Sequence, residues 1–323
     1  MMRIVRLVLL LFVGSGFLRP APAGEIYPPD AKLQQLWNEG DFTEGVAVRA
    51  DGQVFFSDIL RDPKQPGRIL KYDPASNTTT VFSADSRKSN GLAFTESGRL
   101  LAACGANGGA MALCEVLPDG KVQPLVERFH GKRLNSPNDL VVHPNGSVYF
   151  SDPRYIGPEP IELDHQSVYR YELASGRLHR ATTDIEKPNG VHTPPDGRTL
   201  YIAETNNGST GQDPDAKPTP GRMTLNAYDV GNDGTLSNKR VLVNFGDQLG
   251  TDGMAIDREG RIFAAVRSAE RFGIVVYDAS GQELDYLATP QLPTNCAFGV
   301  GDQSHVLYIT AGTGLYRIDL KAR

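Results

Sequence analysis

The sequence predicts an all-β fold, a six-bladed β-propeller with four-stranded antiparallel blades. Three observations carry this prediction. The 34 Gly and 22 Pro residues are spread along the 323-residue chain, as expected for many short strands joined by turns. Outside the N-terminus the sequence shows no long helical period. A unit of four short apolar strands recurs six times at intervals typical of propeller blades.

Each repeat has the same core: a polar residue, an apolar strand, a turn and a second apolar strand. The turns begin at Asp51, Ser97, Asn145, Asp196, Glu259 and Asp302. Their spacings are 46, 48, 51, 63 and 43 residues. Five of the six turns have Gly second, where a positive φ angle costs Gly nothing. The competing all-β fold is a β-sandwich. It would not explain why the same unit, a polar residue, a strand, a turn and a second strand, recurs six times with the same internal spacing.

Two segments depart from the repeat pattern. Residues 206–221 lengthen the fourth interval and are polar and rich in Gly and Pro, so they are predicted to form an inserted loop. Residues 33–37 precede the first repeat. We expect them to supply the outer strand of the last blade, because this would close the ring and cover a free strand edge.

Residues 1–23 have the features of a secretory signal peptide. Arg3 and Arg6 precede an apolar run over residues 7–17, and Ala21-Pro22-Ala23 forms an A-x-A cleavage site. The alternative, a membrane anchor, requires a longer apolar run. We therefore expect cleavage after Ala23, a single propeller domain over residues 24–323, a secreted or periplasmic location, and no membrane association after cleavage.

The charge of the chain narrows the class of partner. The formal net charge is −5, and removal of residues 1–23, which contain three arginines and no acids, makes it −8. Such a surface repels nucleic acid and anionic lipid, so we expect a small-molecule partner and no nucleic acid. We also expect a monomer or a weak oligomer.

The three cysteines show no zinc-ligand spacing. Cys104 and Cys114 are predicted to face each other across a hairpin, either as a disulfide or as two buried thiols. Cys296 has no evident partner in the sequence.

The most informative feature is a phase relation between polar residues and turns. Seven residues before each turn lies a side chain whose oxygen can bind a cation. These residues are Glu44, Asn90, Asn138, Asn189, Asp252 and Asn295. We call them the ring residues, because they lead into the innermost strand of each blade and are expected to converge at one mouth of the central channel.

The composition of the ring predicts a metal site. Two carboxylates and four amides pointing at one spot would repel or go unsatisfied without a cation. Oxygen ligands favour Ca²⁺, with Mg²⁺, Mn²⁺ or Zn²⁺ as alternatives. Loops also favour Asn and Asp for turn chemistry, but that bias does not explain Glu44.

The repeats also carry a family resemblance. The segments KRLNSPNDLVVHPNGSVYFSDPRY, EKPNGV, SNKRVLV, TDGMAID and PTNCAFG resemble the gluconolactonase branch of the SMP-30/gluconolactonase/LRE family. The resemblance covers nearly the whole mature chain. It implies a six-bladed propeller, a catalytic divalent metal and hydrolysis of an aldonolactone. It also implies four metal ligands, Glu44, Asn138, Asn189 and Asp252, and two pocket-lining residues, Asn90 and Asn295.

Further site residues are predicted around this ring. Asp252 is expected to act as a general base as well as a ligand, a choice that leans on the family resemblance. Arg154 and Tyr155, in a loop that the resemblance places near the active-site mouth, are expected to bind substrate. His165, in the loop after Asp152, is the one histidine that we place near the site. The small residues 105–110 stand where relatives carry larger polar residues, and predict weaker discrimination among lactones.

The leading functional prediction is metal-dependent hydrolysis of a sugar-type lactone. The mature chain lacks the G-x-S-x-G, H-E-x-x-H and P-loop motifs. One alternative is a phosphotriesterase- or aryl-esterase-like hydrolase, because a metal polarises those groups in the same way. Another is a non-enzymatic binding propeller in which the metal only braces the funnel. A funnel mouth filled with side chains would favour this last alternative.

Overall fold

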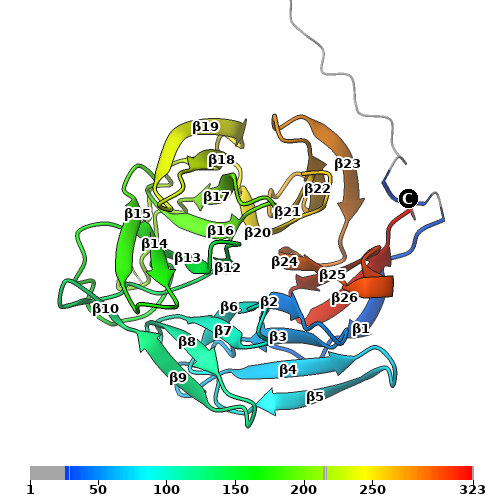
Figure 1. The fold of residues 1–323 in the computed structure, drawn as a ribbon, viewed down its shortest axis with the longest axis horizontal. Helices are drawn as coiled ribbons and strands as arrows, with labels where there is room; N and C mark the ends of the chain where they lie inside the picture. Colours follow the sequence, from blue (N-terminus) through cyan, green and yellow to red (C-terminus); the bar gives the residue numbers. More distant parts are fainter. Residues whose placement is uncertain (1–25, 29, 214, 216, 322–323) are drawn as a thin grey trace, which may run out of the picture.

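The computed structural model describes residues 26–28, 30–213, 215 and 217–321. Their strands form six four-stranded antiparallel sheets around a central axis, as Figure 1 shows. The predicted six-bladed β-propeller is therefore confirmed. The predicted signal peptide and its cleavage site at Ala23 lie outside the described residues.

The strands follow the predicted repeats from the axis outwards. The innermost strands are β2 (Thr43–Val48), β6 (Ser89–Phe94), β12 (Leu140–Val142), β16 (Pro188–His192), β20 (Thr251–Ile256) and β24 (Pro293–Phe298). The second strands are β3 (Val54–Asp58), β7 (Leu100–Cys104), β13 (Ser147–Asp152), β17 (Thr199–Thr205), β21 (Ile262–Val266) and β25 (Val306–Ala311). The third strands are β4 (Arg68–Asp73), β8 (Ala112–Val116), β14 (Ser167–Glu172), β18 (Met223–Val230), β22 (Gly273–Tyr277) and β26 (Gly314–Asp319). The outer strands are β5 (Thr78–Ser83), β9 (Val122–Val126), β15 (Leu178–Thr182), β19 (Leu236–Asn244), β23 (Glu283–Ala288) and β1 (Gln34–Trp37).

Short elements complete the chain. A two-stranded ribbon, β10 (Arg128–Phe129) with β11 (Lys132–Arg133), joins blades two and three, and a 3₁₀ turn, η1 (Gly301–Gln303), joins β24 to β25. The predicted inserted loop connects β17 to β18. In the described part of the chain, no helix reaches the length and hydrophobicity needed to cross a membrane.

The last blade is closed by the start of the chain. Strand β1 pairs antiparallel with β26, and Gln34 lies opposite Arg317. In Figure 1 the blue β1 therefore lies beside the red β26. This pairing confirms the prediction for residues 33–37, and it covers an edge of β26 that would otherwise be free.

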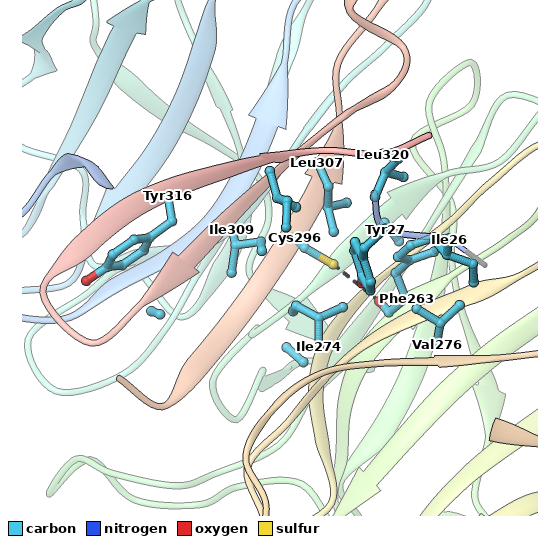
Figure 2. Close-up of a cluster of buried hydrophobic side chains, with 14 residues drawn as sticks. Ile26, Tyr27, Phe263, Ile274, Val276, Cys296, Leu307, Ile309, Tyr316 and Leu320 are labelled. Atoms are coloured by element: carbon cyan, nitrogen blue, oxygen red, sulfur yellow. Dashed lines mark hydrogen bonds between the residues drawn. The ribbon is translucent and has the colours of Figure 1, made fainter. Parts of the chain in front are cut away.

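The hydrophobic core lies between the blades. Six clusters of buried side chains each join two neighbouring blades and so run round the whole ring. Alternate residues of one strand serve opposite faces: Phe55 packs towards blade two, whereas Val54 and Phe56 pack towards blade six. Figure 2 shows the cluster between blades five and six, where Ile26 and Tyr27 join the packing.

Bulges in the inner strands shape the channel mouth. The pairing with the second strand shifts register beside the ring residue in β2, β6, β16, β20 and β24. A bulge turns a side chain out of the regular alternation. The glycine after a ring residue packs on the next blade: a Cβ atom at Gly190 would lie 2.2 Å from the backbone oxygen of Asp252. Glycine therefore lets neighbouring inner strands approach closely at this mouth.

The structure also shows the backbone of the predicted turns and the state of the three cysteines. Glycines 52, 98, 146, 197 and 260, second in five of the predicted turns, all have positive φ angles. Cys104 and Cys114 lie on the neighbouring strands β7 and β8 as free, buried thiols, and Cys296 is also free and buried.

Candidate active site

A cavity of about 380 Å³ opens where the inner strands begin. Five of the six ring residues line it: Glu44, Asn90, Asn138, Asn189 and Asp252. Glu44 and Asp252 are each 4% exposed and Asn189 is 6% exposed, so these side chains form the deep floor of the cavity. Five residues that occupy the same repeat position in the sequence therefore lie around one cavity in the structure.

The two carboxylates on the floor are incompletely compensated. Burial raises the pKa of the Glu44 carboxyl well above its ordinary value, and the negative charge of Asp252 raises it further. Within the described part of the chain, the Glu44 carboxylate accepts one hydrogen bond, from the Gly45 amide at 3.3 Å. Burial also raises the pKa of the Asp252 carboxyl, while Arg267 opposes the rise.

Arg267 is a site residue that the sequence reasoning missed. Its Nη1 atom lies 2.6 Å from Oδ2 of Asp252, and its guanidinium carbon lies 5.8 Å from the centre of the Phe42 ring. Its Nε atom is buried and has no hydrogen-bond partner among the described residues. Arg267 therefore holds one oxygen of the Asp252 carboxylate and still has a donor without a partner.

The donor set on the floor fits a hard divalent cation. Two carboxylates and the amide oxygens of Asn138 and Asn189 are the ligand types that Ca²⁺ and Mg²⁺ prefer. Among the described residues no three His, Cys, Asp or Glu side chains cluster as a metal site, so a cation here would need the amides as well as Glu44 and Asp252. The weakly compensated charge of Glu44 favours such a cation.

The walls of the cavity come from a second set of equivalent positions. In four blades, the residue at or just past the end of the second strand donates its backbone N–H to the residue before the inner strand. These bonds run from Ile59 to Phe42, Gly105 to Lys88, Thr205 to Lys187 and Arg267 to Gly250, at 2.9–3.0 Å. All four donors line the cavity. These four positions, which are equivalent in four blades, therefore form part of the cavity wall next to the floor residues.

Tyr155 lines the cavity, and its hydroxyl is hydrogen-bonded within the protein. The hydroxyl donates a hydrogen bond to the backbone oxygen of Thr205 at 2.9 Å. The Lys187 ammonium lies 4.7 Å from the centre of the Tyr155 ring and donates to Oδ1 of Asn207 at 2.9 Å. Asn207 belongs to the inserted loop and also lines the cavity, so this loop forms part of the wall.

The structure contradicts the expectation for Arg154. This side chain is completely buried and does not line the cavity. Its guanidinium donates to the backbone oxygens of Asn135 at 2.8 Å and Glu159 at 2.7 Å. Because those bonds fix the loop that carries Tyr155, Arg154 positions the wall and cannot contact a substrate.

Asn295 also does not line the cavity. Its Oδ1 atom accepts a hydrogen bond from the Cys296 amide at 2.8 Å, and its Nδ2 atom lies 3.4 Å from Oδ1 of Asp139. Asn295 pairs with Thr310 in the ladder between β24 and β25 and is not among the residues that line the cavity. This geometry therefore gives the predicted contact between Asn295 and substrate no support. His165, which bonds Ser167, does not line the cavity either.

With this geometry established, comparison with known proteins identifies the family. The family model described as the SMP-30/Gluconolactonase/LRE-like region matches residues 42–313, which include all six ring residues. The chain belongs to this family. The resemblance predicted from the sequence is thus confirmed.

Relatives within the SMP-30/Gluconolactonase/LRE-like family match over most of their length. A gluconolactonase of Zymomonas mobilis is 27% identical over 307 residues, covering 88% of this chain and 79% of the relative. Regucalcin of Xenopus laevis is 26% identical over 269 residues, covering 82% of this chain and 81% of regucalcin. The structure of a gluconolactonase from Xanthomonas campestris aligns with a TM-score of 0.76 at 29% identity, covering 94% of this chain and 99% of that one.

Proposed function

We propose that this protein hydrolyses a sugar-type lactone with the help of a divalent cation, Ca²⁺ being the first candidate. The observation that carries the proposal is the convergence of Glu44, Asn138, Asn189 and Asp252 on the floor of an open cavity. The reaction is supported by the names of the relatives, gluconolactonases of Zymomonas mobilis and Xanthomonas campestris. The metal is supported by the all-oxygen donor set.

The cavity itself supports an enzyme over a braced binding module. A funnel filled with side chains would have favoured the binding module. Instead, a space of about 380 Å³ lies above the proposed ligands, within the range of about 300–1,000 Å³ typical of small-molecule sites. A lactone can therefore reach the floor residues.

The proposed reaction assigns a proton route to this chain. The cation, held by the four floor residues, would act as a Lewis acid towards the lactone carbonyl. Water attacks the carbonyl carbon and gives its proton to the Asp252 carboxylate, which Arg267 holds through Oδ2. The ring carbon–oxygen bond then breaks, and the ring oxygen takes up that proton to give a hydroxy acid. The amides of Asn138 and Asn189 cannot accept a proton at neutral pH.

Arg267 supports the assignment of Asp252. Its positive charge opposes the rise in the pKa of Asp252 that burial causes, which favours the ionised carboxylate that a general base needs. Glu44 lacks a comparable ion pair within the described residues, and burial is the main cause of the rise in its pKa. We therefore assign the base role to Asp252 and a ligand role to Glu44.

A hydrolysis screen tests the proposed function. Aldonolactones, aryl esters and phosphotriesters would be offered to metal-stripped protein and to the same protein after Ca²⁺ is restored. We expect hydrolysis of lactones that is lost on stripping and returns with Ca²⁺. Full activity of the stripped protein would contradict the role of the metal, and hydrolysis of phosphotriesters alone would contradict the lactonase function.

Export is proposed on the sequence of residues 1–23. A basic start, an apolar run and an A-x-A site support a secreted or periplasmic location. Protein recovered from its native host should begin near Gly24, which intact-mass measurement would show. A retained Met1 would contradict export by this route.

A further inference from the structure

We infer that the natural substrate is a lactone with an apolar substituent, an alkyl or aryl group, which binds at the rim of the cavity while the lactone ring occupies the floor. This inference rests on the proposed lactonase function and adds the class of substrate. It depends on the contrast between a polar floor and a wall that offers mostly carbon.

Exposed apolar side chains gather at the cavity mouth. In the described part of the chain five large hydrophobic side chains are exposed: Val81, Ile156, Val241, Leu249 and Leu292. Two of these five line this one cavity, Ile156 at 52% exposure and Leu249 at 37%. They come from loops of blades three and five. Grouped exposed apolar residues at a concave site mark a binding surface.

Blade one extends the apolar wall. Phe42 and Ile59, which flank the inner and second strands of that blade, also line the cavity. Between blades two and three the wall contains the small or apolar residues Gly105, Ala106 and Pro137, together with Asn107 and Ser136, whose hydroxyl oxygen accepts from the Ala106 N–H. Apolar or small residues from blades one, two, three and five therefore contribute to the cavity wall.

The polar groups of the wall are largely committed within the protein. The Lys88 ammonium donates to the backbone oxygens of Ile59, Leu60 and Asp62, so it braces a loop instead of facing the cavity. The Tyr155 hydroxyl donates to Thr205. Arg61 lies against the Phe42 ring at 5.4 Å and forms an exposed ion pair with Asp41. A bare, fully hydroxylated lactone would leave many of its hydroxyls without partners at this wall.

Two regions of the cavity thus fit two parts of one molecule. The amides and carboxylates of the floor suit the carbonyl and hydroxyls of a lactone ring. The rim suits a hydrocarbon, whose burial is favourable by about 0.8 kcal/mol per methylene group. The volume of about 380 Å³ accommodates a ring together with a short substituent.

A pair of matched substrates tests this inference on the Ca²⁺-loaded full-length protein. The pair is δ-gluconolactone and its O-hexyl ether at the primary hydroxyl, which has the same lactone ring and no second hydrolysable bond. We expect kcat/KM for the ether to exceed that for the parent by at least about tenfold, because the hexyl chain is buried at the rim. Equal values for the two lactones would overturn the inference and leave the lactonase function standing.

Variants of the rim residues, compared with matched controls, show whether the rim is where the hexyl chain binds. Ile156→Ser and Leu249→Ser should each lower the ether-to-parent ratio of kcat/KM by about threefold or more. The controls Val241→Ser (57% exposed) and Leu292→Ser (39% exposed) remove equally exposed apolar side chains outside the cavity, and should leave the ratio unchanged. A ratio unaffected by both rim variants would overturn the inference. Hydrolysis of neither lactone would overturn the proposed function, and the inference with it.

Discussion

Two buried carboxylates set the chemistry of the cavity floor at the scale of single residues. Glu44 and Asp252 are close enough for each charge to affect the other, and both are almost completely buried. Arg267 pairs with Asp252 at 2.6 Å and leaves Glu44 less compensated. A cation at the floor would relieve this imbalance, and the ion pair favours the ionised form of Asp252 that the proposed base role requires.

Replacement of Asp252 by Asn tests the base role. The amide keeps an oxygen ligand but cannot accept a proton, so we expect metal binding to be largely retained and kcat to fall at least about a hundredfold. Calcium titration and steady-state lactone hydrolysis measure the two effects separately. A near-normal kcat at saturating Ca²⁺ would show that Asp252 is not the base.

At the scale of elements, the starts of the inner strands build the site. Five of these strands have a β-bulge beside the ring residue, and in four blades a glycine follows the ring residue and allows the next blade to approach. At Gly190 the neighbour is backbone, the carbonyl oxygen of Asp252, which cannot rotate away. The position of Asp252, a proposed metal ligand, thus depends on a glycine in the preceding blade.

Gly190→Ala should therefore destabilise the protein. The added Cβ atom overpacks the contact between blades four and five, for which a cost of about 1–3 kcal/mol is typical. The matched control is Gly231→Ala, because the nearest atom to a Cβ there is a side-chain oxygen of Asp233, which can move. Thermal unfolding compares the two, and equal melting temperatures would contradict the role of the glycine.

These same elements show what the sequence could predict. Five ring residues reach the cavity because the polar position keeps a constant phase to the turn in every blade. Asn295 shares that phase but does not line the cavity, and its amide instead accepts from the Cys296 N–H and lies near Asp139. The phase gives a position along a strand and does not give the direction of the side chain.

Arg267 was missed for a related reason. It lies across the hairpin from the ring, where the equivalent wall positions are Ile59, Gly105 and Thr205, which share no residue type. Counting across each hairpin from the inner strand would have identified this wall. Arg154 was misassigned because its sequence position at the mouth does not reveal that backbone carbonyls surround it.

The closed ring sets the stability of the whole molecule. Six interblade clusters form a continuous core, and β1 joins the start of the chain to the last blade. Ile26 and Tyr27 add to the cluster between blades five and six. Residues near the N-terminus therefore hold the last blade in place, far along the sequence from the strands they cover.

Truncation tests this closure. A chain that begins at residue 38 would lack β1 and leave the edge of β26 unpaired. We expect a lower melting temperature and self-association, because an uncovered strand edge pairs with other chains. Size-exclusion chromatography and thermal unfolding would show both. A monomeric truncated protein with an unchanged melting temperature would mean that β1 does not close the ring.

We propose that the floor residues Glu44, Asn138, Asn189 and Asp252, and not all six ring residues, bind the divalent cation. Calcium titration of Asn189→Ala and Asn295→Ala tests it most directly, because the two residues share a repeat position and only Asn189 lines the cavity. We predict that Asn189→Ala raises the Kd for Ca²⁺ at least about tenfold, while Asn295→Ala changes it by less than about twofold. Equal affinities for Ca²⁺ in the two variants would contradict the proposed metal site.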